Sequence, residues 1–203
     1  MAEDPPTRSA ALALVDERGV MRQGYEFLDE KRVLLAAEIL RRLRDYDERE
    51  KEFLRALRSA RDALARAVAR HGLENLQVYP PRLPGPAAPA RRRSLFLGVP
   101  LLALSFEAAP GAPAFAPLDP SPEADECQKA FLQLLEHIAM LAAESGNLRR
   151  LAAEYRRTEK RARALENVLL PEIEERLKRI NEHLEVFDQE EAIRARLAGE
   201  RRG

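Results

Sequence analysis

The sequence predicts an all-α protein, a long antiparallel two-helix coiled coil with a small proline-rich head that carries a short β-hairpin. Charged residues make up 33% of the chain, aromatic residues only 5%, and tryptophan is absent, which is typical of long helices. Two long segments carry apolar residues at helical spacing, and prolines crowd the segment between them. The hairpin is predicted from a short β-friendly run inside that segment.

The first element is an N-terminal coiled-coil helix, predicted over residues 8–72. The chain from Arg8 to Arg70 contains no proline, so one uninterrupted helix of about 60 residues, roughly 90 Å, can form. Apolar residues in this segment follow mixed steps of three, four and seven, which indicate a coiled-coil seam. The predicted seam residues of this helix are Leu28, Leu35, Ile39, Leu57 and Leu64.

The proline-rich head is predicted over residues 73–121, because prolines recur too often for a helix to survive. Within it, Ser94 to Glu107 is rich in Leu, Phe and Val and predicts a short strand or hairpin. Pro80 to Ala90 has the composition of a flexible Pro/Ala-rich loop.

A C-terminal coiled-coil helix is predicted over residues 122–198, where the apolar stripe returns. Pro171 lies inside this helix and predicts a kink around Val168 to Glu172, because proline removes a backbone hydrogen bond. Each stripe alone exposes much apolar surface, so the second helix is expected to fold back antiparallel on the first. The predicted seam residues of this helix are Leu148, Leu165, Leu169, Ile173, Ile180 and Leu184.

Charge and composition argue against several classes of protein. Lys plus Arg equals Asp plus Glu at 34 each, so no bulk field attracts nucleic acid or an anionic membrane. The apolar stretch Leu95 to Phe106 is broken by Gly98 and Pro100 and falls far short of the roughly 20 residues of a membrane span. With no signal peptide and the single Cys127, we expect a cytoplasmic protein with protein partners and no direct membrane insertion.

Candidate residues for chemistry are sparse, and we predict no catalytic, cofactor-binding or metal site. His71, His137 and His183 lie far apart and lack a second ligand at helical spacing, so they are interpreted as surface or seam-edge histidines. Cys127 is interpreted as a buried or half-buried thiol. The glycine-rich loops that cradle phosphate are missing, which disfavours nucleotide binding.

Arg91, Arg92 and Arg93 form a compact basic run beside the apolar segment of the head. Such a run can contact phosphate or an acidic protein groove. Because no aromatic residues are interleaved with the arginines and the net charge is zero, a solvated loop or docking patch is favoured over a nucleic-acid-binding module. Charge blocks elsewhere, such as Arg41 to Arg44, are interpreted as the solvent face of the helices.

Three short motifs stand out along the chain. Pro6-Thr7-Arg8 is followed by Gly24 and Leu28, the head contains Gly98-Val99-Pro100, and the second long segment contains the block from Arg161 to Pro171. These motifs resemble the start, the short head motif and the R-x-N-A-L-E-x-V-x-I-P block of the family of V/A-type ATPase D subunits, the central-stalk rotor family. Arg163 stands where that family usually has asparagine.

The resemblance implies a non-catalytic rotor component that transmits torque between the A/B catalytic hexamer and the membrane ion-translocating ring. Sequential ATP hydrolysis, or proton or sodium flow in reverse, would turn it. Its partners would be the A and B subunits, the small F subunit and the funnel-like C subunit, at the membrane periphery. The terminal segments, Arg8 to Lys31 and Arg161 to Glu191, would enter the A/B cavity, and Leu95 to Phe106 would form the basal hairpin.

On the same resemblance, individual contact residues are expected. The A/B cavity would be faced by Arg8, Leu12, Arg22, Lys31, Arg161, Arg163, Glu166, Arg176 and Arg179. The F subunit would bind near Leu43, Tyr46, Phe53, Phe131, His137 and Leu141.

Two other interpretations share the same predicted rod. An export-apparatus stalk protein also pairs with a hexameric ATPase, and the block from Ala164 to Pro171 favours the rotor family over it. A prefoldin-like chaperone or other coiled-coil adaptor would form a homo-oligomer and would not bind A or B subunits.

Overall fold

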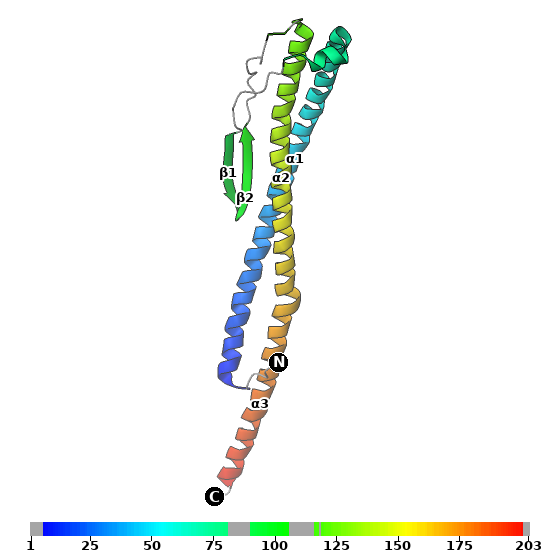
Figure 1. Cartoon of the computed structure of the whole chain (residues 1–203). Coiled ribbons are helices and arrows are strands. Elements are labelled where there is room, and N and C mark those ends of the chain that lie inside the picture. The colour runs from blue at the N-terminus through cyan, green and yellow to red at the C-terminus, as the bar shows by residue number, and fades with distance from the viewer. Residues whose placement is uncertain (1–5, 81–89, 106–115, 118, 201–203) are drawn as a thin grey trace. The chain divides into compact units, whose positions relative to one another are not determined.

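The computed structural model describes residues 6–80, 90–105, 116–117 and 119–200, with side chains to residue 197. It confirms the predicted fold class: two long helical segments packed antiparallel, with a two-stranded hairpin between them in the sequence (Figure 1). The elements in order are α1 (Arg8–Gln77), β1 (Ala90–Phe96), β2 (Val99–Ser105), α2 (Pro122–Ala164), η1 (Leu165–Leu169) and α3 (Leu170–Glu200).

The chain divides into two compact units, and the long helices contribute to both. Unit 1 comprises Met1–Leu34 and Tyr155–Gly203, and unit 2 comprises Leu35–Glu154. The start of α1 therefore packs with the C-terminal helices, and the rest of α1 packs with α2.

Local sequence explains where α1 begins and where its path breaks. The Thr7 hydroxyl accepts a hydrogen bond from the Ala10 N–H at 3.2 Å, which caps the first turn. Near the other end, Gly72 has φ +74° and ψ 158°, so the helical path is interrupted there before Gln77. A positive φ favours glycine because a Cβ would clash with the backbone. The long segment free of proline thus extends as a helix to this glycine.

The start of α2 is fixed by the sequence Ser121-Pro122-Glu123. The Ser121 hydroxyl accepts a hydrogen bond from the Ala124 N–H at 3.2 Å. Pro122 occupies the first helical position, where its missing N–H has no helical partner to lose. Glu123 and Asp125 in the first turn complement the positive end of the helix dipole.

In unit 1, the core is a small cluster in which Leu14 of α1 packs with Ile173 and Ile180 of α3, all at most 5% exposed. Arg8 donates to the Asp188 carboxylate at 2.9 Å. Since low numbers on α1 meet high numbers on α3, the two helices run antiparallel here. Partly buried neighbours complete the cluster: Ala10, Ala11, Met21, Leu177 and Leu184.

Between α2 and α3 the chain makes one π-helical turn, η1, in which the Leu170 N–H donates to the Leu165 carbonyl five residues earlier. Pro171 follows directly and cannot donate a backbone hydrogen bond. A wider turn gives the proline ring room beside the carbonyls of the preceding turn. The kink predicted around Val168 to Glu172 stays a prediction, and the structure has the π turn Leu165–Leu169 at this place.

In unit 2, α1 and α2 also run antiparallel. Ion pairs and hydrogen bonds join Arg42 to Glu144 and Arg66 to Glu126 across the two helices. Leu35 and Leu151 are fully buried, and farther along Ala63 and Ala67 pack with Cys127. The small side chains of Ala63, Ala67 and Cys127 let the helices approach closely at that level.

The hairpin pairs β1 with β2 in antiparallel register, from Ala90 opposite Ser105 to Phe96 opposite Val99. Leu97 and Gly98 form the two-residue loop with φ +48° and +85°. Positive φ at both loop residues is the type I′ geometry that suits the twist of a hairpin. Figure 1 shows β2 between β1 and α2.

The hairpin begins earlier than predicted, because Arg91 to Arg93 belong to β1. Residues 81–89 of the predicted Pro/Ala-rich loop, and Phe106 and Glu107 of the predicted strand segment, lie outside the described residues. Among the helices described, none combines the length and apolarity that crossing a membrane requires.

Candidate partner-binding surfaces and a buried polar network

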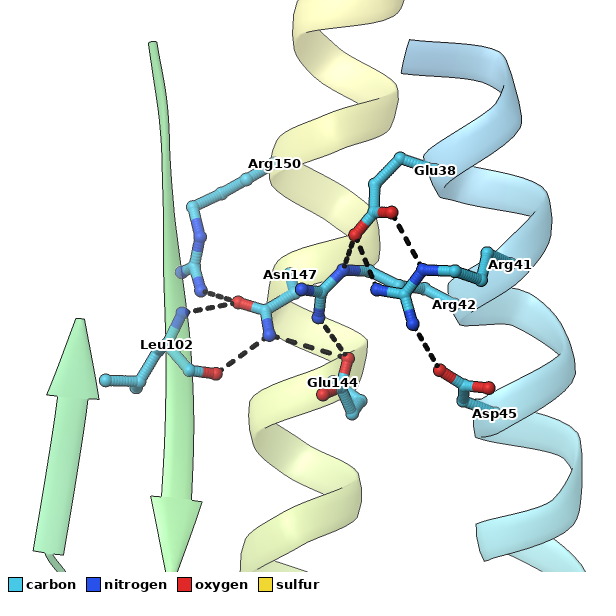
Figure 2. Close-up of polar contacts among 8 residues, drawn as sticks. All are labelled: Glu38, Arg41, Arg42, Asp45, Leu102, Glu144, Asn147 and Arg150. Carbon is cyan, nitrogen blue, oxygen red and sulfur yellow. Dashed lines mark hydrogen bonds and ion pairs between the residues drawn. The ribbon is translucent and has the colours of Figure 1, made fainter. Parts of the chain in front are cut away.

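Asn147 on α2 connects the helix to the hairpin and is only 1% exposed. Its side-chain oxygen accepts the Leu102 N–H at 2.8 Å, and its side-chain nitrogen donates to the Leu102 carbonyl at 2.8 Å. Leu102 is on β2, at the edge that faces α2 (Figure 2). The amide thus supplies the hydrogen bonds that a neighbouring strand would supply to this residue.

Asn147 also takes part in contacts along α2. Arg150, one turn later, donates to the Asn147 oxygen at 2.7 Å, and the Asn147 nitrogen lies 3.5 Å from a Glu144 oxygen. Figure 2 shows the amide beside the β2 backbone, with the Arg150 guanidinium near its oxygen and the Glu144 carboxylate near its nitrogen. Both polar ends of Asn147 are therefore satisfied, as burial of an amide demands.

The network continues from α2 to α1 through Arg42. This guanidinium donates to Glu144 at 2.8 Å and to Glu38 at 2.6 Å, and the three side chains are 12–17% exposed. Arg41 donates to both Glu38 oxygens and to Asp45 (Figure 2). Within the charge block Arg41 to Arg44, Arg42 therefore lies against α2 and is an exception to the interpretation of most of these charges as solvent face.

The network also sets the charge state of Glu38. The hydrogen bond from Arg41, with a further one from Arg42, lowers the pKa of the Glu38 carboxyl although partial burial opposes this. The same contact raises the pKa of Arg41. Glu38 therefore stays ionised and holds two arginines of α1, one of which contacts α2.

A second polar contact joins the end of α1 to the start of α2. His71 Nε2 lies 2.5 Å from the Ser121 hydroxyl, His71 Nδ1 lies 3.6 Å from Asp119, and the Tyr79 ring is 5.8 Å away between centroids. These residue types resemble a nucleophile, base and acid set. Ser121, however, is 4% exposed and already caps α2. The arrangement therefore fastens two helix ends and offers no open nucleophile.

The residues predicted for the A/B cavity lie in unit 1. Leu12 is 67% exposed, and Arg22, Arg161 and Glu166 are exposed. Others are in ion pairs: Arg8 with Asp188, Arg163 with Glu159 and Arg179 with Glu175. Lys31 and Arg176 are partly buried. Glu166 has an effect on Tyr25, because its negative charge raises the pKa of that phenol.

The residues predicted for the F subunit lie in unit 2. Leu43 and Phe131 are 51% and 41% exposed, whereas Tyr46, Phe53, His137 and Leu141 are half-buried. Sequence reasoning did not select some exposed apolar neighbours on the same helices. These are Leu40, Leu54, Leu135 and Ile138, which are 40–56% exposed. Phe131, Leu135 and Ile138 recur at steps of four and three, so that spacing was an available signal.

The predicted seam residues differ in burial. Leu35, Ile173 and Ile180 are buried, and six are half-buried: Leu28, Ile39, Leu57, Leu148, Leu165 and Leu184. Leu64 and Leu169 are exposed at 36% and 39%, and the place of these two residues in the seam stays a prediction. Ala60, Ala63 and Ala67 are buried near Leu64, and Leu169 lies in the π turn.

Cysteine and histidine chemistry is limited in the part of the chain that is described. No group of three His, Cys, Asp or Glu side chains there is placed to hold a metal ion. Cys127 is 8% exposed, and burial raises the pKa of its thiol. A raised pKa makes the thiolate, the reactive form, scarcer.

Comparison with known proteins identifies similar chains over nearly the whole length. The family model for the ATP synthase D subunit matches residues 11–200. A V-type ATP synthase D subunit from Anaeromyxobacter dehalogenans is 30% identical over 97% of this chain and 95% of its own. A V-type ATP synthase D subunit from Thermotoga neapolitana is 28% identical over 93% of each chain. An A-type ATP synthase D subunit from Thermococcus sibiricus is 29% identical over 93% of this chain and 90% of its own.

Proposed function

Since this chain belongs to the family of ATP synthase D subunits, we propose that it is the central-stalk rotor subunit of a V/A-type rotary ATPase. In this role it is non-catalytic and transmits torque between the A/B hexamer and the membrane ion-translocating ring. It works in the cytoplasm at the membrane periphery, in a complex that moves protons or sodium ions.

The observation that carries the proposal, beside the family, is the pairing of α1 with an antiparallel helix in each unit. A single helix twists easily, whereas two helices joined by side-chain contacts resist turning relative to each other. The Arg42 to Glu144 ion pair and the packing of Leu14 on Ile173 and Ile180 are such contacts. Close packing in the cores resists deformation, because displacing packed side chains loses many contacts at once.

The end proposed to enter the A/B cavity is unit 1. Its exposed charged side chains, including Arg22, Arg161 and Glu166, suit a surface that moves past changing neighbours. Exposed ion pairs contribute only about 0 to 1 kcal/mol each, so such contacts form and break readily. The weak pairs Arg163 with Glu159 and Arg179 with Glu175 leave these arginines free to exchange partners.

The F subunit is proposed to bind unit 2 through the exposed apolar residues of α1 and α2. Leu43 on α1 and Phe131 on α2 belong to this surface, and Leu135 and Ile138 extend it. Burial of apolar area stabilises association by roughly 25 cal/mol per Å². The C subunit is proposed to seat the lower part of the stalk above the membrane ring.

The family match favours this role over the export-apparatus stalk protein and the coiled-coil chaperone or adaptor. Those alternatives make different assemblies. A chaperone or adaptor forms a homo-oligomer, and an export stalk does not support ATP-driven rotation inside an A/B hexamer.

The test is rotation in a reconstituted complex of the full chain with its cognate A, B and F subunits. Cys127→Ala removes the buried thiol, and Ser94→Cys on exposed β1 provides a site for a bead. With the hexamer fixed to a surface, addition of ATP should turn the bead in one direction. A bead on a B subunit is the matched control and should stay still. Assembly of A, B and F without this chain, or a bound chain that never turns during hydrolysis, would refute the proposal.

A further inference from the structure

The hydrogen-bonding direction of the hairpin residues can be assigned from Leu102. In an antiparallel pair, residues alternately direct both backbone groups toward the partner strand or away from it. The N–H and the carbonyl of Leu102 both bond to Asn147, so they point away from β1. Pro100, two residues earlier, has the same orientation, which suits a residue without an N–H.

The same alternation fixes β1. Leu102 is opposite Arg93, Leu104 is opposite Arg91, and Pro100 is opposite Leu95. Arg91, Arg93 and Leu95 therefore direct their backbone N–H and carbonyl groups outward, at the edge away from α2 (Figure 1). No hydrogen bond between described residues uses these groups, and all three residues are exposed. β1 thus presents an edge that no strand or side chain of the described residues occupies.

The side chains at this edge carry a concentrated positive charge. Arg91, Arg92 and Arg93 are consecutive and exposed, and within the described ranges none of them forms an ion pair. With a rise of about 3.3 Å per residue, Arg91 and Arg93 lie on one face of the strand about 7 Å apart. Like charges at an open edge discourage pairing with a second copy of the same strand. They favour an acidic strand instead.

We propose that the outer edge of β1 binds an extended acidic segment of another protein as a third strand. Backbone groups of the segment would pair with those of Arg91, Arg93 and Leu95, and its carboxylates would pair with the arginine side chains. Nucleic acid fits less well, because phosphates pair with the charges but leave the alternating backbone groups unused. The inference is independent of torque transmission, which needs no third strand.

The test uses the full chain labelled for amide detection and a synthetic peptide of about seven residues, a typical strand length, alternating Glu with Thr. Binding should slow hydrogen exchange at the Arg91, Arg93 and Leu95 amides. The Arg92 and Ser94 amides, which face β2, should not change. A matched peptide with Lys in place of Glu should not bind.

Two substitutions at Arg93 separate the contribution of its charge to peptide binding from the contribution of its backbone hydrogen bond. Arg93→Thr removes the charge and keeps the N–H, and should weaken peptide binding by about threefold. Arg93→Pro removes both, and should weaken it by roughly a further fivefold. Since the Arg93 N–H does not face β2, protection of the Arg92 and Ser94 amides should persist in both variants and show an intact hairpin.

Several results would overturn the proposal. One is equal peptide binding by the Thr and Pro variants with the hairpin intact. Another is peptide binding without protection of the three outward amides. A third is a single-stranded oligonucleotide of equal charge that displaces the peptide and protects no amide, which would reduce the edge to a general anion patch.

Discussion

The side-chain amide of Asn147 pairs with both backbone polar groups of Leu102, 45 residues away in the sequence, at 2.8 Å each. One helical residue thereby occupies the place of a neighbouring strand along β2. Because the amide is buried, the contact is shielded from competing water.

Replacement of the Asn147 amide should remove the hydrogen bonds that hold the hairpin against α2. Asn147→Ala leaves the Leu102 N–H and carbonyl without protein partners, and should lower the free energy of unfolding by about 1 to 3 kcal/mol. Urea unfolding measures the loss, and amide exchange at Leu102 should accelerate. Asn181→Ala, at an exposed asparagine of α3, should change stability by no more than about 0.5 kcal/mol. Equal effects of the two variants would contradict the role of Asn147.

The hairpin loop offers a stabilising substitution. Leu97 has φ +48°, a conformation that costs a β-carbon residue energy, and the type I′ loop prefers Asn followed by Gly. Leu97→Asn should raise the free energy of unfolding by about 0.5 to 1 kcal/mol, measured by urea unfolding. Leu95→Asn, in the same hairpin but at a strand position, should not stabilise. A destabilised Leu97→Asn variant would show that the Leu97 side chain contributes more than its backbone strain costs.

Acid should lower the free energy of unfolding of unit 2, because it protonates the Glu38 carboxylate. Its pKa in the folded chain is lowered by Arg41 and Arg42, so the unfolded chain takes up the proton first as pH falls. The stability contribution is fully present above the ordinary carboxyl pKa of about 4.3, and is lost as pH falls through the lower folded value. Glu38→Gln should lose roughly 2 kcal/mol at neutral pH and show a flatter decline in acid.

The pH experiment is urea unfolding across neutral to acid conditions. Glu48→Gln, at an exposed glutamate of α1, is the matched control and should keep the wild-type profile within about 0.5 kcal/mol. A Glu38→Gln profile parallel to the wild type would contradict the assigned role of Glu38.

Glycine to alanine substitution should have opposite signs at two positions of α1. At Gly24 a Cβ would meet Leu165 at 3.7 Å, an ordinary contact, so Gly24→Ala should stabilise by about 1 kcal/mol. At Gly72, with φ +74°, the same change should destabilise by about 1 kcal/mol. Thermal unfolding measures both. A destabilised Gly24→Ala variant would show that the Leu165 side chain lies too close to Gly24 to leave room for a Cβ.

The antiparallel helices could be predicted because their signal is repetitive: each apolar stripe recurs over many turns and needs a partner. The hairpin was predicted from Leu, Phe and Val, but its start was missed because three consecutive arginines do not resemble a strand. The size and spacing of Leu64 favour the seam, while the neighbouring alanines Ala60, Ala63 and Ala67 are the buried residues.

Contacts between distant residues could not be predicted. Asn147 and Leu102 have no shared motif, and the polar residue in the middle of a helix gives no sign of its partner. Arg42 resembles the charges around it, and only the position of α2 distinguishes it from Arg41. The contact residues expected for the A/B cavity and for the F subunit remain predictions.

The π turn Leu165–Leu169 also sets an angular offset along the C-terminal half of unit 1. Each residue of an α-helix advances the side-chain direction by about 100°, so one residue more or fewer in this turn would swing every later side chain around the axis. Ile173 and Ile180 would then leave Leu14, and polar neighbours would take their place. The five residues of the π turn thus determine the direction in which every side chain of α3 points around the helix axis.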